Sequence, residues 1–524
     1  MTVEGDIAGR LQMLAGREIL RWCYPAERLR LYVHHGSRPR PIRLSPGLIE
    51  AAQLDIGPVS PLPDLPPSDM SGHLHQGCPT STAVITVSAA AGFTTSPHWS
   101  PRSWLARAAY HTSPLLFSQI RHVAERLQQV WTQARRPAAA DHGPAPLSPA
   151  ARPAPGSQHP ALVFAVNWFE MGGAERFAFD CVKWALDDGF RVIVLPDRPS
   201  SHDHFSEAIG RRMAILRTDL HCDAALYQRL VLALHARAGV AAIHIHHSHR
   251  MYGVLSALRR LPDAPVTIDT THIIEASDDC FVAASGRMTH LLDHHHVISD
   301  SLRETYRIRF GRTRNVHVGF LAPPFIDKPD DAFGIAHHKP TYRIGFVGRL
   351  TFQKRPFVFI YLAARLIKRE QPNDPKLTFT VVGDGLLLDK TIALARRLGV
   401  ADRIAFTGRT KDTSRTMADL DIVVLPSANE GLTLVAYEAW DAGVLPVATN
   451  VGAQGELVPD DLRGPVSPVA FIRFARHVIA RLCSDRFFAA KQLNAFRAKR
   501  MDIATRRSGH DVVTGLYRTA LRRH

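Results

Sequence analysis

The sequence contains no apolar stretch of about 18 residues, the length from which a membrane-spanning helix is recognised. Its first residues, MTVEGDIAGRLQMLAGREILRW, are interrupted by charges and lack the apolar core of a secretory signal. Both absences argue against an integral membrane protein or an exported protein. We therefore expect a cytoplasmic protein, and peripheral attachment to the inner face of a membrane stays open.

Cysteine is scarce as well. The 524 residues include six cysteines, at positions 23, 78, 181, 222, 280 and 483, with no short paired spacing. This excludes a disulfide framework and favours reduced thiols in a reducing compartment. The 28 histidines include His244, His246, His247, His249 and the run 294–296, yet no companion cysteine or carboxylate has the spacing of a zinc site. We expect neither a metal nor a cofactor.

Acidic residues are outnumbered by basic ones. The chain has 48 Asp and Glu against 64 Lys and Arg, which gives a formal net charge of +16. A field of this sign attracts phosphate-rich surfaces or polymers. No helix-turn-helix, zinc finger or RNA-binding aromatic signature is present, which argues against nucleic acid as a partner. An anionic membrane surface explains the charge more economically, and a merely solubilising surface is the alternative.

Length and composition predict two or three domains, because 45% of the residues are hydrophobic. Residues 1–135 contain helix-like pieces near 6–22 and 115–134, separated by a proline-rich stretch at 57–72, and no motif. We assign them to an N-terminal module of unknown fold and role. Residues 136–160 are rich in proline and alanine and are typical of an extended linker.

The most informative segment is a strand, a loop and a helix in the second half. IVVLP (422–426) is a short apolar run typical of a buried parallel strand, and LTLVAYEAWDAG (432–443) has apolar positions at helical spacing. Amides near Gly431, Leu432 and Thr433 would be the unpaired donors of the first helical turn. Together with the helix dipole they favour an anion such as a diphosphate.

Two glutamates accompany this helix. Glu430 lies in the loop and Glu438 follows about two turns later. Each could accept hydrogen bonds from hydroxyl groups on opposite sides of the anion, one from a transferred sugar and the other from a ribose. The alternative is that Glu430 only caps the helix and Glu438 is a solvated helical residue.

Further strands precede this segment, each followed by or ending in a glycine: YRIGFVGRL (342–350), LTFTVVGDG (377–385) and IAFTG (404–408). Strands that alternate with helices imply a parallel sheet, whose ligands bind beyond the carboxyl ends of the strands. Gly383 and Gly408 lie at such ends, and Arg349 and Lys354 follow the first strand. Two cations beside a helix N-terminus would neutralise a leaving diphosphate without a divalent metal, although isolated cations are usually ordinary surface residues.

The motifs GRLTFQKRP, VVGDG, FTG and EGLTLVAYEAWDAGVLPVAT, in this order and at these intervals, resemble the nucleotide-binding half of the retaining glycosyltransferases of family 4, the glycosyl transferases group 1. That family has the GT-B fold, in which two Rossmann-like domains face a cleft. The resemblance is specific over roughly residues 340–460 and weaker from about 160 to 325. It implies that Arg349 and Lys354 hold the donor phosphates, that Glu430 lies near the donor sugar and that Glu438 binds the ribose.

The first half resembles the other wall of that cleft. NWFEMGGAE (167–175) looks like the family's first-strand loop, so Gly172 and Gly173 are expected to approach the donor phosphates and the acceptor. His272 closes a strand in a Thr-x-His setting that often lies near the reacting sugar in that family. A purely structural histidine is the alternative. The segment VHVGFLAPPF (316–325) departs from the family, whose members commonly carry an Asn-Gly pair there.

We therefore predict an α/β protein of the GT-B fold with an N-terminal extension. The predicted parts are an acceptor-side domain at 161–330, a nucleotide-sugar-binding domain at 338–508 and a terminal helix at 509–524 that packs back on the acceptor-side domain. The last of these follows from the resemblance alone.

The resemblance implies a retaining hexosyltransferase that moves a sugar from a nucleotide-diphosphate sugar to a hydroxyl group. The acceptor would be a glycan or a lipid-linked glycan in bacterial polysaccharide, lipopolysaccharide or glycolipid synthesis. A nucleotide-sugar 2-epimerase of the same architecture and a non-catalytic scaffold that binds sugar nucleotide or polysaccharide are the alternatives.

Overall fold

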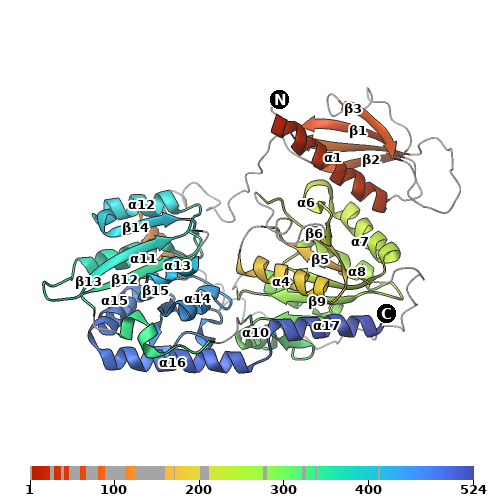
Figure 1. The fold of residues 1–524 in the computed structure, drawn as a ribbon. Helices are drawn as coiled ribbons and strands as arrows, with labels where there is room; N and C mark the ends of the chain where they lie inside the picture. The colour runs from red at the N-terminus through yellow and green to blue at the C-terminus, as the bar shows by residue number, and fades with distance from the viewer. Residues whose placement is uncertain are drawn as a thin grey trace.

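The chain is described by a computed structural model, in which three units each contain one β-sheet (Figure 1). The residues that the structure describes are 3–23, 29–36, 40–46, 59–65, 81–88, 112–123, 160–169, 172–200, 212–274, 280–321, 326–336, 339–410 and 413–523. The predicted linker, up to residue 159, therefore lies outside them.

The N-terminal unit is a helix packed on a four-stranded sheet of order β2-β4-β1-β3. Its elements are α1 (Val3–Cys23), β1 (Leu29–Gly36), β2 (Arg40–Pro46), β3 (Val59–Leu65) and β4 (Ser81–Ser88). The sequence predicted the helix but not the strands. β1 pairs in parallel with β4 across a long intervening segment, and such a distant pairing leaves no local pattern.

β3 lies inside the proline-rich stretch at 57–72, for which the composition predicted no strand. Proline has no N–H group to donate to a strand ladder, so it is tolerated in an edge strand. β3 is at the edge of this sheet, where it pairs with β1 and places Pro61 opposite Tyr32.

The first α/β domain contains a parallel seven-stranded sheet of order β11-β10-β9-β8-β5-β6-β7. The strands are β5 (Ala161–Val166), β6 (Arg191–Pro196), β7 (Met213–Ile215), β8 (Val240–His246), β9 (Val266–Thr271), β10 (His294–Val297) and β11 (Val316–Val318). The helices are α4 (Gly173–Asp187), α6 (Thr218–His221), α7 (Ala224–Ala238), α8 (His249–Leu258), α9 (Phe281–Arg287), η3 (Thr289–Leu291) and α10 (Asp300–Phe310).

The N-terminal unit packs on this domain. Ile19 and Leu20 of α1 are buried in the same apolar cluster as residues of α7 and β8. Arg229 of α7 donates a hydrogen bond to the carbonyl oxygen of Cys23 at 3.0 Å, and the guanidinium of Arg237 lies 5.4 Å from the ring centre of Trp22. The unit therefore shares a core with the first α/β domain.

The second α/β domain contains a parallel six-stranded sheet of order β14-β13-β12-β15-β16-β17. Its strands are β12 (Thr341–Val347), β13 (Lys376–Val382), β14 (Ile404–Gly408), β15 (Ile422–Leu425), β16 (Leu445–Thr449) and β17 (Arg463–Gly464). Its helices are η4 (Asp330–Ala332), η5 (Gly334–Ala336), α11 (Pro356–Ile367), α12 (Leu388–Arg397), η6 (Ala401–Arg403), α13 (Thr413–Ala418), α14 (Leu434–Ala442), η7 (Gln454–Glu456), η8 (Asp460–Leu462) and α15 (Pro468–Ser484).

Two helices at the end of the chain join the domains. α16 (Arg486–Thr505) lies along the second domain, and α17 (Gly509–Arg523) lies beside α4 and β8 of the first (Figure 1). Tyr517 of α17 is fully buried there. A backbone bridge between Phe320 and Ser508 marks the crossing point.

The domains also meet at Glu456. Its carboxylate accepts hydrogen bonds from the backbone amides of Asp300 and Ser301 at 3.1 and 2.7 Å. These amides belong to the first turn of α10, whose unpaired donors and positive dipole end favour an acidic partner. A carboxylate of one domain thus caps a helix of the other.

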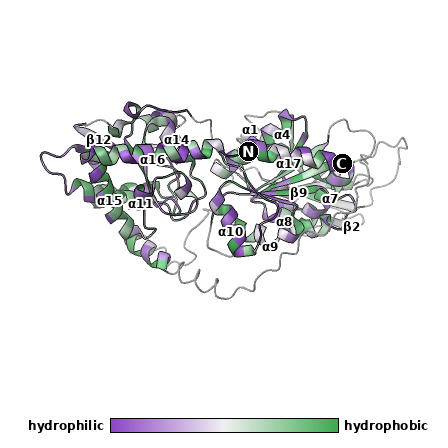
Figure 2. Ribbon diagram, turned by 90° about the horizontal axis from the view of Figure 1, so that it is seen from below, coloured by the Kyte–Doolittle hydropathy of each residue, from purple (hydrophilic) through white to green (hydrophobic). Residues whose placement is uncertain are grey.

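Parallel strands covered by helices on both faces form the cores of both α/β domains. Every residue of β5, β8, β9, β15 and β16 is buried. Figure 2 shows the complementary pattern on covering helices such as α10 and α16, where hydrophilic and hydrophobic residues alternate along the ribbon. Continuous apolar strands are the ordinary result of burial on both faces.

Candidate functional site

A cleft of about 570 Å³ lies between the two α/β domains. Loops at the carboxyl ends of the strands of both domains line it, which is the edge where parallel sheets bind ligands. Most of the residues predicted for the site reach it: Gly172, Gly173, His272, Arg349, Lys354, Glu430, Gly431, Leu432 and Thr433.

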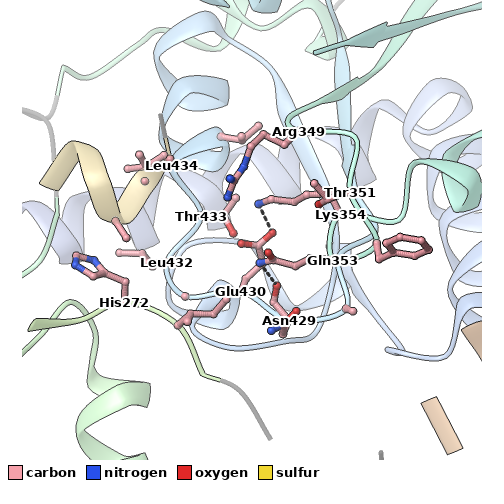
Figure 3. A pocket seen from close by; sticks show the side chains of 18 of the residues that line it. His272, Arg349, Thr351, Gln353, Lys354, Asn429, Glu430, Leu432, Thr433 and Leu434 are labelled. Carbon is pink, nitrogen blue, oxygen red and sulfur yellow. Dashed lines mark hydrogen bonds and ion pairs between the residues drawn. The ribbon is translucent and has the colours of Figure 1, made fainter. Parts of the chain in front are cut away.

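The basic side of the cleft follows β12. Arg349 and Lys354 both line the cleft, and Figure 3 shows their side chains extending toward Glu430 and Thr433. Among the described residues the guanidinium of Arg349 makes no hydrogen bond or ion pair. An unengaged guanidinium beside a second cation can bind an anionic group bidentately.

Lys354 and Glu430 form an ion pair across the loop that follows β15. The Lys354 Nζ lies 2.5 Å from Oε1 of Glu430 (Figure 3), and Glu430 is only 6% exposed. The amide of Ala428 donates to the carbonyl oxygen of Gln353 at 2.7 Å, and the Gln353 side chain donates to that of Asn429 at 3.0 Å. These hydrogen bonds hold the two loops together, so the ion pair has a fixed position.

α14 directs its N-terminus to the same place. The helix begins at Leu434, two residues later than its apolar pattern suggested, with Thr433 as the N-cap. The Thr433 hydroxyl does not cap the helix; it is buried, has no hydrogen-bond partner in the described part of the chain, and lines the cleft. The first helical turn and this hydroxyl together can donate hydrogen bonds to an anion.

Gly431 lies very close to the backbone of the first domain. A β-carbon on this residue would lie 1.6 Å from the carbonyl oxygen of His272, and Gly431 bridges Ile273 as an isolated antiparallel pair. The amide of Ile274 also donates to the carbonyl oxygen of Glu430 at 3.4 Å. Gly431 thus lines the cleft, as predicted for the site, and also brings its backbone against that of the first domain.

The glycine loop of the first domain faces the cations. Gly172 is the N-cap of α4, and a β-carbon there would lie 3.6 Å from Nη2 of Arg349. Beside it, the indole N–H of Trp168 donates to Oε1 of Glu175 at 2.6 Å, and both residues line the cleft. Only the glycines of this motif were predicted for the site, and Trp168 and Glu175 carry no signal of their own in the sequence.

His272 faces the cleft from the end of β9. It is 6% exposed, and its Nε2 atom has no hydrogen-bond partner among the described residues. Figure 3 shows its side chain among those that line the pocket. Burial lowers its pKa well below the usual value, and the nearby rings of His247 and His246 lower it further. The ring is therefore neutral at pH 7 and can exchange hydrogen bonds with hydroxyl groups without carrying charge.

Other predicted residues lie outside the cleft lining. The amide of Gly383 donates to the carbonyl oxygen of Gly408 at 2.8 Å, so this pair joins the ends of β13 and β14. Glu438 is half-buried within α14. Burial raises its pKa, and the charges of Arg176 and Lys354 oppose that effect. The structure does not place Gly383, Gly408 or Glu438 against the cleft.

The histidines form a buried network under α4 and α17. The hydroxyl oxygen of Thr270 lies between two rings, 2.7 Å from Nε2 of His244 and 3.1 Å from Nδ1 of His296. The carbonyl oxygen of Gly319 accepts from Nε2 of His296, and the hydroxyl of Tyr517 lies 2.6 Å from Nδ1 of His244. One consistent set of neutral tautomers satisfies the chain, since each ring donates from Nε2 and accepts at Nδ1.

This network also contains a companion cysteine that spacing did not reveal. Ligand atoms of Cys181, His244 and His246 lie within 4.8 Å of one another in the described part of the chain. Both ring nitrogens of His244 are already hydrogen-bonded, however, and burial raises the pKa of the Cys181 thiol far above its usual range. Neither residue is prepared to bind a cation.

One further wall of the cleft was not foreseen. Phe117, Ser118 and Arg121 line it from the helical residues 114–123, which the sequence analysis placed in the N-terminal module. Only the helical pattern of this segment was visible in the sequence. Its contact with a domain more than two hundred residues away along the chain was not.

Known proteins are similar to parts of this sequence. The family model of glycosyl transferases group 1 matches residues 327–497. The chain is 33% identical over 121 residues to the Vi polysaccharide biosynthesis protein VipC/TviE of Salmonella typhi, which is 23% of this chain and 20% of that protein. It is 41% identical over 128 residues to D-inositol 3-phosphate glycosyltransferase 2 of Catenulispora acidiphila, 23% of this chain and 30% of that protein. The match thus spans less than a third of either relative.

Solved structures extend the likeness to both α/β domains. Anabaena HepE in complex with UDP has a TM-score of 0.51 and 19% identity, covering 69% of this chain and 99% of that one. Sucrose-phosphate synthase of Thermosynechococcus elongatus has a TM-score of 0.53 and 16% identity, covering 70% and 100%. The predicted GT-B arrangement, two Rossmann-like domains that face a cleft, is confirmed. In the part of the chain that the structure describes, no helix is long and apolar enough to cross a bilayer.

Proposed function

We propose that this protein is a glycosyltransferase that moves a hexose from a nucleotide-diphosphate sugar to a hydroxyl group with retention of configuration, as in family 4. One observation carries the proposal. Within the segment that matches glycosyl transferases group 1, Arg349, Lys354 and the N-terminus of α14 meet at a single cleft. That combination suits a diphosphate.

The donor diphosphate binds between these groups. Arg349 contributes a forked guanidinium, and Lys354 contributes an ammonium with three donors, so it can bind a phosphate while keeping one hydrogen bond to Glu430. The first amides of α14 and the hydroxyl of Thr433 complete the anion site. Fixed cations and amides neutralise the charge that develops on the leaving group, so we propose that no divalent metal is needed.

The polar groups around this position hold the sugars. Glu430 accepts hydrogen bonds from the donor sugar, and His272 lies on the opposite wall as a neutral partner for the donor sugar or the acceptor hydroxyl. Glu438 binds the ribose in our proposal. It lies deeper in α14 than the cleft lining, so this role requires the nucleoside to extend along the helix.

The chemical step exchanges one bond for another. The bond between the anomeric carbon and the phosphate oxygen breaks, and its electron pair leaves with the nucleoside diphosphate. The acceptor oxygen bonds to the anomeric carbon on the same face through an oxocarbenium-like state, and its proton passes to the departing phosphate. Domain closure, anchored by Gly431 against the first domain, excludes water and aligns the reactants.

The relatives suggest the setting. Anabaena HepE binds UDP, and the Salmonella typhi relative is a polysaccharide biosynthesis protein. We propose a uridine nucleotide sugar as the first donor to test and a glycan or lipid-linked glycan as the acceptor, in bacterial envelope polysaccharide synthesis. The net charge of +16 supports a place at the cytoplasmic face of an anionic membrane, with no role in nucleic-acid binding.

The test is a panel of uridine, guanosine and adenosine diphosphates and their glucose conjugates, without metal, on the wild type and on Lys354→Ala. We expect a rise in thermal midpoint selective for one base, absent from the variant, and slow release of nucleotide from the matching sugar conjugate. A folded wild-type protein that responds to none of these compounds would contradict the proposal.

A further inference from the structure

Residues 114–123 belong to the N-terminal part of the chain but lie against the second α/β domain. The hydroxyl of Ser467 donates to Oε1 of Gln119 at 2.8 Å. Leu115 and Phe117 pack against the apolar core of that domain. Polar and apolar contacts thus hold the segment in a defined position at the edge of the cleft.

The segment has two distinct faces. Phe117, Ser118 and Arg121 line the cleft, and their spacing of one and three residues puts them on one side of a helix. Leu116 and Ile120 point away from the cleft and are 59% and 62% exposed. The helix therefore presents an aromatic ring, a hydroxyl and a guanidinium to whatever the cleft binds.

Arg121 adds positive charge beyond what the donor diphosphate uses. The proposed donor site accounts for Arg349 and Lys354. The carboxylates of Glu175 and Glu430 also line the cleft, and each is already engaged in a hydrogen bond or ion pair there. Arg121 has an interaction of its own within the protein, and the five N–H donors of its guanidinium still allow an anionic group in the cleft to bind.

Resting on the proposed function, we propose that Phe117 and Arg121 belong to the acceptor site and that the acceptor carries a phosphate or a carboxylate. The guanidinium of Arg121 pairs with this anion, because both a planar carboxylate and a tetrahedral phosphate offer two oxygens to its parallel N–H groups. The ring of Phe117 covers an apolar face of the acceptor sugar. The N-terminal module thereby supplies acceptor specificity to a cleft that the two α/β domains leave incomplete.

The experiment measures thermal stabilisation of the full chain by glucose, glucuronate and glucose 6-phosphate. We expect the two anionic sugars to stabilise the wild type and glucose to have no effect. Because a hydrogen bond to a charged group contributes about 1.5–3 kcal/mol, Arg121→Ala should weaken the apparent affinity about tenfold or more. Phe117→Ala should weaken it too, whereas Leu116→Ala, on the exposed face of the same helix, should match the wild type.

The variants distinguish binding at the acceptor site from binding at the donor site. A response that is lost in Lys354→Ala but kept in Arg121→Ala would place the anion in the diphosphate site and overturn the inference. An equal response to glucose, or no response in the wild type, would overturn it as well. If the wild type binds no nucleotide yet binds anionic sugars through Arg121, the proposed function fails, and of this inference only the anion site at Arg121 stands.

Discussion

A β-carbon on Gly431 would lie 1.6 Å from the carbonyl oxygen of His272, which belongs to the opposite domain. Real β-carbons do not approach backbone oxygen this closely, so the two domains meet here only because position 431 has no side chain. Glu430 and Thr433 flank the contact and line the cleft. The closeness of the domains and the geometry of the anion site therefore depend on the same residue.

Gly431→Ala should prevent this approach. The domains must separate locally or the loop must shift, and misplacement of about 1 Å commonly costs about 10²-fold in turnover. We expect a loss of that size in nucleotide-sugar turnover, with circular dichroism unchanged. Gly253→Ala is the control, because nothing lies within 4 Å of a β-carbon there and the residue is inside α8. Equal activity of the two variants would show that the contact has no part in closure.

Lys354→Ala should reduce turnover by about 10²-fold or more, by analogy with the loss of one preorganised charge-stabilising donor. The variant also leaves the buried carboxylate of Glu430 without its cation. The double variant Lys354→Ala/Glu430→Gln should therefore recover part of any lost stability but none of the turnover. Measured rates and urea midpoints for both single variants and the double variant complete the cycle. Recovery of turnover in the double variant would mean that Lys354 serves only Glu430.

Stability should fall as the pH drops below about 6.5. Burial lowers the pKa of His247 to about 4 and that of His296 to about 3, while the unfolded chain titrates near 6.5. Between these values the unfolded state binds more protons, so the free energy of unfolding decreases with decreasing pH. Asp197 acts in the opposite direction, because burial raises its pKa to about 6, but the lowered histidines outnumber it.

Urea unfolding at pH 7.5, 6.5, 5.5 and 4.5 measures this slope. His246→Leu should make the slope shallower without loss of stability at pH 7.5. Burial also lowers the pKa of His246, and its ring nitrogens accept or donate no hydrogen bond among the residues that the structure describes. A free energy that stays constant from pH 7.5 to 5.5 would contradict neutral burial of the rings.

Glu456→Ala should loosen the junction between the domains. The variant removes the acceptor for two backbone amides at the start of α10, and loss of a helix cap costs about 1 kcal/mol. We expect a lower thermal midpoint and weaker nucleotide binding, the second because closure becomes less favourable. Asp460→Ala is the control, since its side chain is 77% exposed and surface ion pairs contribute little. An identical midpoint for both variants would show that the cap has no energetic role.

Much of the second α/β domain could be predicted from short segments. The predicted runs 342–350, 377–385, 404–408 and 422–426 coincide with β12, β13, β14 and β15. Each strand ends at or just before a glycine or a proline, and β15 is the continuous apolar run that burial on both faces of a parallel sheet requires. The order of these runs predicts Arg349, Lys354 and Glu430 at one sheet edge, and all three line the cleft.

Other features depend on contacts that no local pattern encodes. The closeness of Cys181 to His244 and His246 follows from α4 packing on β8, and spacing along the chain had argued against it. β3 lies in a proline-rich stretch, and its sequence therefore does not look like a strand. Proline is tolerated there because an edge strand need not donate every N–H group to a neighbouring strand.

For the second α/β domain the sequence by itself determined the strands and the charged motifs that follow them, because strand pattern, glycine turns and charged motifs act over a few residues. The tertiary structure alone decided that Gly431 meets His272 and that residues 114–123 form a wall of the cleft. The hydrogen bond between Ser467 and Gln119 spans 348 residues of chain. Such contacts depend on how buried side chains from distant parts of the chain pack together, and no short sequence pattern encodes that packing.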